Sequence, residues 1–474
     1  MSTPLVVDLD GTLARTDVLV ESYLDLFKKR PGSALRALAI LLMRGKAAFK
    51  ARIGAYATFD PEMLPYVDEV LEHIHQARAE GRPVYLATAA DRTMAEAVAA
   101  HLDCFDGVLA SEGEANLKGE TKAARLKDRF GAQGFDYIGD SRADIPVWKA
   151  SRSACMVDPT AGLEKRVRRM KDSGQVLVLA RREDGLQAFI RLIRPHQWVK
   201  NILVFVPLLA AHAFTGEAFL LALTAFVAFS LCASSVYIIN DLFDLQSDRK
   251  HQSKRYRPLA AGKVKLRTAA LVAPLLLAGA LGMAATLSMA FLGVLIGYFA
   301  LTFSYSTFLK RNMMLDVVIL GLLYTLRIFA GVVALDLVVS QWMMGFSLFF
   351  FFALAVMKRT TELVALAAEK TSGKTSGRGY FVADLDLLNA LAGSSGMASL
   401  VILLFYLNTL GDTGLYDNPE LLWLVIPILL YWFGRALLLA HRGDMYDDPI
   451  VFATRDRISL VCGGLVALTF ISSL

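Results

Sequence analysis

The chain is too apolar for an ordinary soluble protein and too charged for a simple bundle of membrane helices. Its 474 residues are 55% hydrophobic and 20% charged, with a formal net charge of +6, and the mean hydropathy is +0.46. Soluble domains are roughly 45–50% apolar, and the modest Gly and Pro contents exclude collagen and disorder of the whole chain. Four widely spaced cysteines without zinc-like spacing indicate reduced thiols.

Up to about residue 180, the sequence predicts a soluble α/β domain. Short apolar segments alternate with longer helical patterns, which indicates a parallel sheet covered by helices. The predicted strands are Leu5–Leu9, Val84–Thr88 and Tyr137–Gly139. Asp8 and Asp10 interrupt the first apolar run, so the N-terminus is not predicted to be a secretory signal.

From Trp198 onward, long apolar stretches predict membrane helices, because about 20 mostly apolar residues cross a bilayer. Nine spans are predicted, near 198–214, 218–239, 269–288, 290–309, 314–335, 342–357, 388–410, 420–440 and 457–474. Basic residues concentrate in alternate loops, whereas loops 211–217, 335–341 and 408–420 contain no Lys or Arg. The sequence therefore predicts an integral protein of a bacterial inner-type membrane. Its soluble domain and basic loops would lie in the cytoplasm, with the C-terminus on the opposite side.

Residues 181–197 are predicted to be a basic linker between the two halves. Within it, Gly185–Arg194 combines apolar residues with arginines. The pattern fits a solvated linker or a helix lying on anionic lipid headgroups, and both readings stay open.

Two carboxylates, Asp8 and Asp10, follow the first predicted strand and precede Gly11-Thr12. Ligands of open α/β sheets bind at the carboxyl ends of strands. There, one aspartate can attack a phosphorus atom while its neighbour protonates the leaving oxygen. Taken alone, the pair could instead merely cap a turn, which is the lesser alternative.

Later segments supply further groups of the same kind. Thr88 ends the second strand, Lys118 precedes a helical pattern, and Asp140 follows the third strand, where it could share Mg²⁺ with Asp8. In this order, the motifs resemble the haloacid-dehalogenase-like phosphatase superfamily over about residues 1–170.

This resemblance implies Asp8 as the nucleophile that forms an aspartyl-phosphate and Asp10 as the acid/base. Thr88 and Lys118 would bind the phosphoryl group, with Lys122 as the weaker alternative to Lys118. The metal would be held by the carboxylates Asp8, Asp10, Asp140 and Asp144. The domain would cover residues 1–180, with a helical cap at about 14–75.

The second predicted span ends in an acidic motif that begins at Asn240 and contains Asp241, Asp244 and Asp248. On one helix these three aspartates share a face, where they repel one another unless cations neutralise them. Oxygen ligands suit Mg²⁺, which commonly bridges carboxylates and substrate phosphates. The basic segment 249–258 follows, so the composition indicates a diphosphate site, with a solvated helix end as the alternative.

A second polar segment, with Tyr305, Lys310 and Asp316, follows the fourth predicted span. Two aspartate-bearing segments in a predicted nine-helix protein resemble the UbiA superfamily of intramembrane prenyltransferases over about residues 186–474. Aromatic prenyltransferases have two aspartates in the second segment, so the single one here favours cations that bind phosphate. Further segments resemble the polyprenyl-phosphate phosphoribosyltransferase branch, namely 194–201, 254–262 and 447–453.

This second resemblance implies that a polyprenyl phosphate attacks the ribose C1 of 5-phosphoribosyl diphosphate, with diphosphate leaving. Asp241 and Asp244 would be catalytic, and the metal ligands would be Asp241, Asp244 and Asp248. The predicted substrate-binding residues are Lys200, Asn201, Asn240, Arg249, Lys254, Arg257, Tyr305, Lys310, Asp316 and Arg327. Arg327 falls inside a predicted span, where arginine is costly and functional by default, although a pair with a carboxylate is the alternative.

The transferase product would carry a 5-phosphate, which the N-terminal domain is predicted to remove. One Mg²⁺ is expected in each domain. The expected partners are a polyprenyl phosphate lipid, phosphoribosyl diphosphate and the membrane; no nucleic acid is expected, and a homo-oligomer stays open.

Three alternatives remain: an aromatic, quinone-type prenyltransferase with an unrelated phosphatase, a transporter driven by an aspartyl-phosphate, and a catalytically silent soluble domain. The single Asp316 argues against the first, and the lack of a P-loop argues against the second. The complete set of acidic, hydroxyl and lysine positions argues against the third. Loop 371–379 is predicted to be a connector, with a mobile lid as the alternative.

Overall fold

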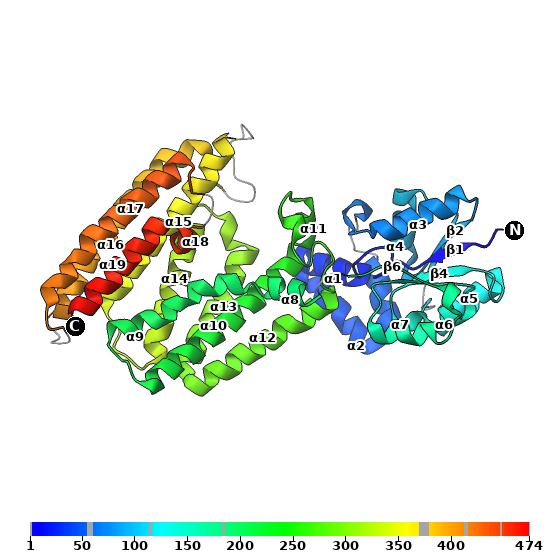
Figure 1. The fold of residues 1–474 in the computed structure, drawn as a ribbon, viewed down its shortest axis with the longest axis horizontal. Helices are drawn as coiled ribbons and strands as arrows, with labels where there is room; N and C mark the ends of the chain where they lie inside the picture. Colours follow the sequence, from blue (N-terminus) through cyan, green and yellow to red (C-terminus); the bar gives the residue numbers. More distant parts are fainter. Residues whose placement is uncertain are drawn as a thin grey trace. The chain divides into compact units, whose positions relative to one another are not determined.

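The computed structural model describes residues 2–54, 60–112, 116–182, 185–368, 379–411, 416–445 and 448–473 (Figure 1). The chain divides into two compact units. The first unit contains residues 1–193 and 237–273, and the second contains residues 194–236 and 274–474. The segment 237–273 therefore belongs to the same unit as the predicted soluble domain.

Six parallel strands form one sheet in the first unit, in the order β3-β2-β1-β4-β5-β6. The strands are β1 (Leu5–Val7), β2 (Val84–Asp91), β3 (Gly107–Ser111), β4 (Asp136–Gly139), β5 (Ala154–Val157) and β6 (Val176–Ala180). The three predicted strands are confirmed as β1, β2 and β4. Strand order reverses between β1 and β4, and such a switch point is where ligands bind in open α/β sheets.

Helices cover both faces of the sheet, because successive side chains of a strand point to opposite faces. In β1, Leu5 and Val7 join one hydrophobic cluster, whereas Val6 joins the other. Figure 1 shows helices of the first unit on the two sides of the strands. The first face is covered by α3 (Asp68–Ala79) and α4 (Arg92–Leu102), and the second by α5 (Glu120–Phe130), α6 (Ile145–Ala150) and α7 (Ala161–Arg168).

A helical pair follows β1, consisting of α1 (Val18–Lys29) and α2 (Pro31–Gly54), which pack against each other. The predicted cap at 14–75 also includes the start of α3. Val70 and Ile74 of α3 are buried in the hydrophobic cluster against the sheet. We therefore assign the insertion to the α1–α2 pair and α3 to the covering of the sheet.

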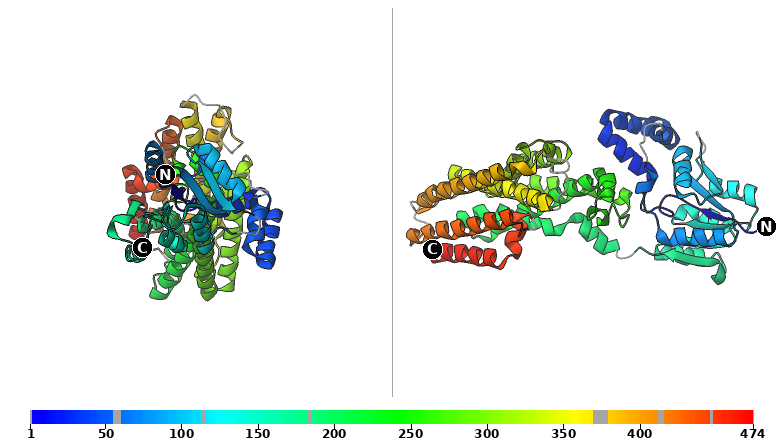
Figure 2. Two further views of the ribbon diagram at one scale, coloured as in Figure 1. Left: turned by 90° about the vertical axis from the view of Figure 1, so that its right-hand side faces the viewer. Right: turned by 90° about the horizontal axis from the view of Figure 1, so that it is seen from above.

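Seven helical segments of the described residues are long and apolar enough to cross a membrane, which makes the chain an integral membrane protein. They are Gly216–Phe243 (α10), Leu266–Leu287 (α12), Met289–Thr307 (α13), Leu315–Ala334 (α14), Gln341–Ala368 (α15), Val382–Thr409 and Pro419–Arg442. The last two contain most of α16 (Leu385–Gly411) and all of α17 (Val425–Arg442). Within the second unit, α15 packs against α14 and α16 (Figure 2).

The predicted count of nine spans is not confirmed, since an eighth arises only if the bent pair α18 (Pro449–Arg455) and α19 (Arg457–Ser473) is one span. The predicted span near 198–214 is instead the 3₁₀ helix η4 (Pro195–Phe205) followed by the short α9 (Val206–Ala210). A proline lies in the first turn of each. Proline favours helix starts, so this apolar stretch contains two short helices rather than one long helix.

A buried ion pair fixes the segment 237–273 within the first unit. Arg249, in the short helix α11 (Leu245–Lys250), places its Nη1 2.6 Å from Oε1 of Glu21 on α1, and the two side chains are 6% and 5% exposed. Arg249 also donates a hydrogen bond to the Met63 carbonyl at 3.0 Å. Both charges are thus compensated away from water.

We expect Arg249→Ala to loosen this attachment, because it leaves the Glu21 carboxylate buried without its cation. Breaking a buried pair from one side costs about 3–5 kcal/mol. Hydrogen–deuterium exchange of the full chain should show faster exchange in α1 and α11. Lys250→Ala is the matched control, since its pair with Asp60 is largely exposed and such pairs contribute about 0–1 kcal/mol. Equal exchange in the two variants would contradict a structural role for the pair.

Candidate active sites

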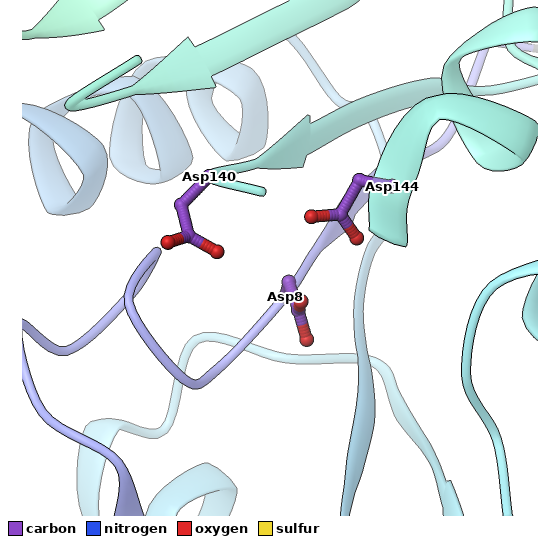
Figure 3. Close-up of side chains that lie close together, drawn as sticks. All are labelled: Asp8, Asp140 and Asp144. Atoms are coloured by element: carbon purple, nitrogen blue, oxygen red, sulfur yellow. The ribbon is translucent and has the colours of Figure 1, made fainter. Parts of the chain in front are cut away.

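Three carboxylates converge at the switch point of the sheet. Asp8 follows β1, Asp140 follows β4, and Asp144 ends the short 3₁₀ helix η2 (Arg142–Asp144). Each can offer an oxygen within 4.8 Å of the others, and Figure 3 shows the three carboxylates close together. An all-oxygen, triply acidic group is suited to Mg²⁺, which is a hard cation. These side chains therefore fit the metal expected for this half of the chain.

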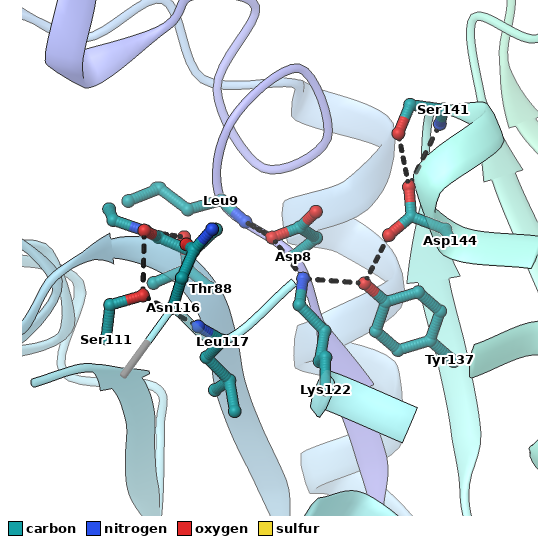
Figure 4. Close-up of polar contacts among 12 residues, drawn as sticks. Asp8, Leu9, Thr88, Ser111, Asn116, Leu117, Lys122, Tyr137, Ser141 and Asp144 are labelled. Atoms are coloured by element: carbon teal, nitrogen blue, oxygen red, sulfur yellow. Dashed lines mark hydrogen bonds and ion pairs between the residues drawn. The ribbon is translucent and has the colours of Figure 1, made fainter. Parts of the chain in front are cut away.

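A buried lysine lies against Asp8. Lys122 of α5 is 3% exposed, and its Nζ lies 2.9 Å from Asp8 Oδ1. It also donates to the Tyr137 hydroxyl at 3.0 Å, which donates in turn to Asp144 Oδ1 at 2.8 Å (Figure 4). The network joins two of the three carboxylates through one cation and one phenol.

The turn after β1 depends on a glycine. Gly11 has φ of +78°, and a Cβ at this position would lie 2.5 Å from Asp140 Oδ2. Only glycine meets both conditions without strain. In the same turn, Asp10 Oδ1 accepts a hydrogen bond of 2.9 Å from the Val18 amide at the start of α1. Asp10 therefore connects this turn to the helical insertion rather than joining the three-carboxylate group.

Burial raises the pKa of both aspartates of the first motif, but to different values. It raises the pKa of Asp8 to about 6, although Lys122 opposes the shift. Burial, and next the charge of Asp17, raises the pKa of Asp10 to about 8. Near neutral pH, Asp8 is thus mostly ionised and Asp10 mostly protonated, which are the states that a nucleophile and a general acid require.

A cavity of about 460 Å³ opens over these groups. The three clustered carboxylates and Asp10 line it together with seven basic side chains, Arg15, Lys50, Lys118, Lys122, Arg182, Lys265 and Arg267. Cations around a metal-competent acidic centre suit a phosphorylated ligand.

The second acidic motif, Asp241, Asp244 and Asp248, also belongs to the first unit, and each of its carboxylates forms an ion pair with a basic side chain. Helix α10 ends before Asp244 and α11 begins after it, so the motif does not lie on one uninterrupted helix. Arg257 Nη1 nevertheless joins Asp241 Oδ1 at 3.2 Å and Asp248 Oδ2 at 2.7 Å. Lys28 Nζ of α1 lies 2.9 Å from Asp244 Oδ1. Each carboxylate thus has a positive neighbour that a divalent cation could replace.

Within the second unit, Arg327 of α14 is buried among neutral partners. Its Nε donates to Asn201 Oδ1 at 2.8 Å, its Nη2 to the Tyr298 hydroxyl at 2.8 Å, and its Nη1 to the Leu323 carbonyl at 2.5 Å. The side chain is 5% exposed. None of these three contacts is with a carboxylate, so they orient the guanidinium without balancing its charge.

Two further buried charge groups belong to the second unit. Asp316 is fully buried against Arg359, whose Nε lies 2.8 Å from its Oδ2, and it accepts a hydrogen bond from the Tyr380 hydroxyl. Lys200 and Lys358 both lie beside Asp448 Oδ2, at 3.3 and 2.8 Å. Asp447 and residues 371–378 of the predicted loop lie outside the described residues.

Comparison with known proteins decides the family. Residues 202–457 match the UbiA prenyltransferase family, and residues 5–149 match the haloacid dehalogenase-like hydrolases. The chain belongs to the UbiA prenyltransferase family. Both resemblances predicted from the motifs are confirmed.

Relatives of this UbiA family chain include both full-length and partial matches. Protein y4nM of Sinorhizobium fredii is 38% identical over 475 residues, which cover 99% of this chain and 91% of that protein. Nodulation protein NoeC of Azorhizobium caulinodans is 34% identical over 274 residues, covering 57% and 87% of the two chains. Decaprenyl-phosphate phosphoribosyltransferase of Mycolicibacterium smegmatis is 30% identical over 282 residues, covering 58% and 88%.

In the hydrolase-like part, the tertiary structure places Lys122 rather than Lys118 against Asp8. Lys118 is exposed and lines the cavity. The signal for Lys122 was its position on the face of α5 that also buries Ala123 and Leu126. Thr88 is 1% exposed in β2, and its Oγ1 accepts a hydrogen bond from the Ala90 amide at 3.0 Å.

The remaining predicted residues of the UbiA part lie in different helices. Asn240 is in α10, Tyr305 is near the end of α13, and Lys310 is in the 3₁₀ helix η6 (Leu309–Arg311). Lys254 is exposed in the 3₁₀ helix η5 (Lys254–Tyr256). Arg249 forms a buried ion pair with Glu21, which is a structural contact, and its contact with substrate stays a prediction.

Mg²⁺ should stabilise the first unit more strongly at higher pH. Burial also raises the pKa of Asp140, to about 7. An acid with a raised folded-state pKa stabilises the fold fully below its unfolded pKa, near 4, and that contribution is lost progressively as pH rises from there through the folded pKa values of about 6 to 8. Without metal, stability should therefore fall over this interval, and Mg²⁺ should restore it by binding the ionised carboxylates.

Thermal unfolding with chelator and with Mg²⁺, at about pH 5 and about pH 8, measures this effect. Asp140→Asn should raise the metal-free midpoint at the higher pH, because it removes repulsion, and should weaken the response to Mg²⁺. Asp128→Asn, on the exposed face of α5, is the control that should behave as wild type. An undiminished Mg²⁺ response in Asp140→Asn would contradict the assignment of the three-carboxylate site.

Proposed function

We propose that the chain transfers 5-phosphoribose from phosphoribosyl diphosphate to a polyprenyl phosphate and then removes the 5-phosphate from the product. The observation that carries the transfer step is Arg327, which is buried with neutral partners inside a membrane helix and so suits an anionic substrate group. Similarity to decaprenyl-phosphate phosphoribosyltransferase supports the same substrate class.

In the transfer step, an oxygen of the polyprenyl phosphate attacks the ribose C1 and the bond to the diphosphate breaks. Asp241, Asp244 and Asp248 would hold Mg²⁺, which neutralises charge on the departing diphosphate. Lys254, Arg257 and Lys310 would contact phosphate groups. Arg257 already lies between Asp241 and Asp248, so it would shift from carboxylate to phosphate when the metal binds.

In the hydrolytic step, Asp8 attacks the phosphorus of the 5-phosphate and Asp10 protonates the departing ribose oxygen. The proton on Asp10 is consistent with its pKa of about 8. Lys122 lies 2.9 Å from Asp8 Oδ1, where it would orient the nucleophile and contact the phosphoryl oxygens. Water then hydrolyses the aspartyl-phosphate, with Asp10 as the base.

The fusion gives the second step a local supply of substrate. A product that stays in the membrane remains near the tethered hydrolase domain, which raises its effective concentration there. The two activities therefore form a sequence in which the first creates the phosphomonoester that the second removes.

Purified full-length protein supplied with phosphoribosyl diphosphate, Mg²⁺ and polyprenyl phosphate tests both steps by mass spectrometry of the lipids. Wild type should yield polyprenyl-phosphoryl ribose, whereas Asp8→Asn should accumulate the lipid that is heavier by one phosphoryl group. Asp241→Asn should reduce transfer by roughly a hundredfold or more, since it weakens stabilisation of the leaving group. Asp128→Asn serves again as the control.

Each outcome separates one step from the other. Complete dephosphorylation by Asp8→Asn would refute the proposed role of the hydrolase domain. Prenylation of an aromatic acid without any ribosylated lipid would replace the transfer step with the aromatic alternative.

We also propose that the soluble part and the basic loops face the cytoplasm. Lys254 follows α10 and Glu217 lies at its beginning, so a membrane span separates two exposed positions. The four native cysteines are buried, which leaves introduced ones to react. In intact cells, an impermeant maleimide should label Glu217→Cys but not Lys254→Cys, and the reverse pattern would invert the topology.

A further inference from the structure

The segment 237–273 brings basic residues to the cavity of the hydrolase-like part. Arg249 anchors it to Glu21 at 2.6 Å. Near its end, Gly262 has φ of +64°, and a Cβ there would lie 2.5 Å from Arg15 Cβ. The backbone at Gly262 therefore packs directly on Arg15, which lines the cavity, and this contact places the residues after Gly262 at the rim of the cavity.

The next residues of this segment complete the lining. Lys265 and Arg267 both border the cavity. Lys265 Nζ lies 3.5 Å from Asp140 Oδ2, and Arg267 forms an ion pair with Asp17. Their side chains are nevertheless 57% and 68% exposed. The backbone of Lys265 and Arg267 is thus fixed, whereas their charged ends are accessible to a ligand.

Three other cations of the cavity lie deeper and are each paired with a carboxylate, namely Lys122, Arg15 and Arg182. Lys122 is buried against Asp8. Arg15 and Arg182 both contact Asp158, with side chains 24% and 18% exposed. A single phosphoryl group at Asp8 would thus be contacted by Lys122 and by the Mg²⁺ that the clustered carboxylates could hold, whereas the rim holds additional, accessible positive charge.

We propose that Lys265 and Arg267 bind a second anionic group of the hydrolase substrate, a phosphodiester on the same molecule as the phosphomonoester. This inference rests on the proposed function, in which the ribose carries a 5-phosphate and a polyprenyl phosphodiester. Lys offers a point charge and Arg a planar pair of donors, and both bind phosphate strongly. The UbiA part of the chain would in this way supply the selectivity of the hydrolase part for the UbiA product.

Two soluble substrates test this selectivity without requiring the transfer reaction. Ribose 5-phosphate carries one anionic group, and a short alkyl phosphodiester of ribose 5-phosphate at C1 carries two. Wild-type full-length protein with Mg²⁺ should have the higher kcat/KM for the diester. In Lys265→Ala/Arg267→Ala, the ratio of the two kcat/KM values should fall about tenfold or more, mainly through KM, since charge-assisted hydrogen bonds to the diester are lost.

Lys263→Ala is the matched control, because Lys263 is an exposed cation of the same segment outside the cavity lining. It should leave the ratio unchanged, and Arg267→Lys should retain part of the preference. Raising the ionic strength should lower the wild-type ratio of kcat/KM for the diester to that for ribose 5-phosphate, because salt screens exposed cations such as Lys265 and Arg267.

The outcomes distinguish this inference from the proposed function. If wild type hydrolyses ribose 5-phosphate but shows no preference for the diester, or if the double variant keeps the wild-type ratio, the rim role is refuted and the hydrolase step stands. If wild type hydrolyses neither substrate, both proposals fall.

Discussion

Mutual repulsion among Asp8, Asp140 and Asp144 is the constraint on which the first unit depends. The neighbouring positions of β1 and β4 bring these carboxylates within 4.8 Å of one another. Such an arrangement persists only where positive charge, hydrogen bonds or protonation compensate it. Lys122 supplies a positive charge and the Tyr137 hydroxyl donates a hydrogen bond to Asp144. Mg²⁺ would supply further positive charge, and Gly11 leaves space for Asp140 beside the turn.

The same requirement governs the charged residues of the UbiA part. Asp241 and Asp248 are almost completely buried, yet both lie beside Arg257. Asp316 is buried against Arg359. Removing charges from water is costly unless the geometry of the pair is good. Arg327 differs because its described hydrogen bonds go to neutral groups, which leaves a positive charge available to a substrate anion.

Local sequence patterns predicted the chemistry more fully than its geometry. The positions of Asp8 and Asp140 followed from apolar strands that end in acidic turns, since parallel strands present their carboxyl ends at one edge. The sequence favours Lys118 and an exposed Lys122 on a helix, whereas packing of α5 against the sheet buries Lys122 beside Asp8. Lys200 and Asp448 lie in segments that the resemblance singled out, but no local pattern indicates that they meet each other and Lys358, because the three are far apart in the chain.

The sequence by itself determined the two families, three of the six parallel strands, and the acidic and basic groups, because these properties reside in short motifs and in hydropathy. The tertiary structure shows that η4 and α9 replace the first predicted span, a break that prolines at the two helix starts explain. It also decided that Arg249 pairs with Glu21 and that Lys265 borders the hydrolase cavity. Long-range packing makes these contacts, and neither periodicity nor composition records which distant residues it will bring together.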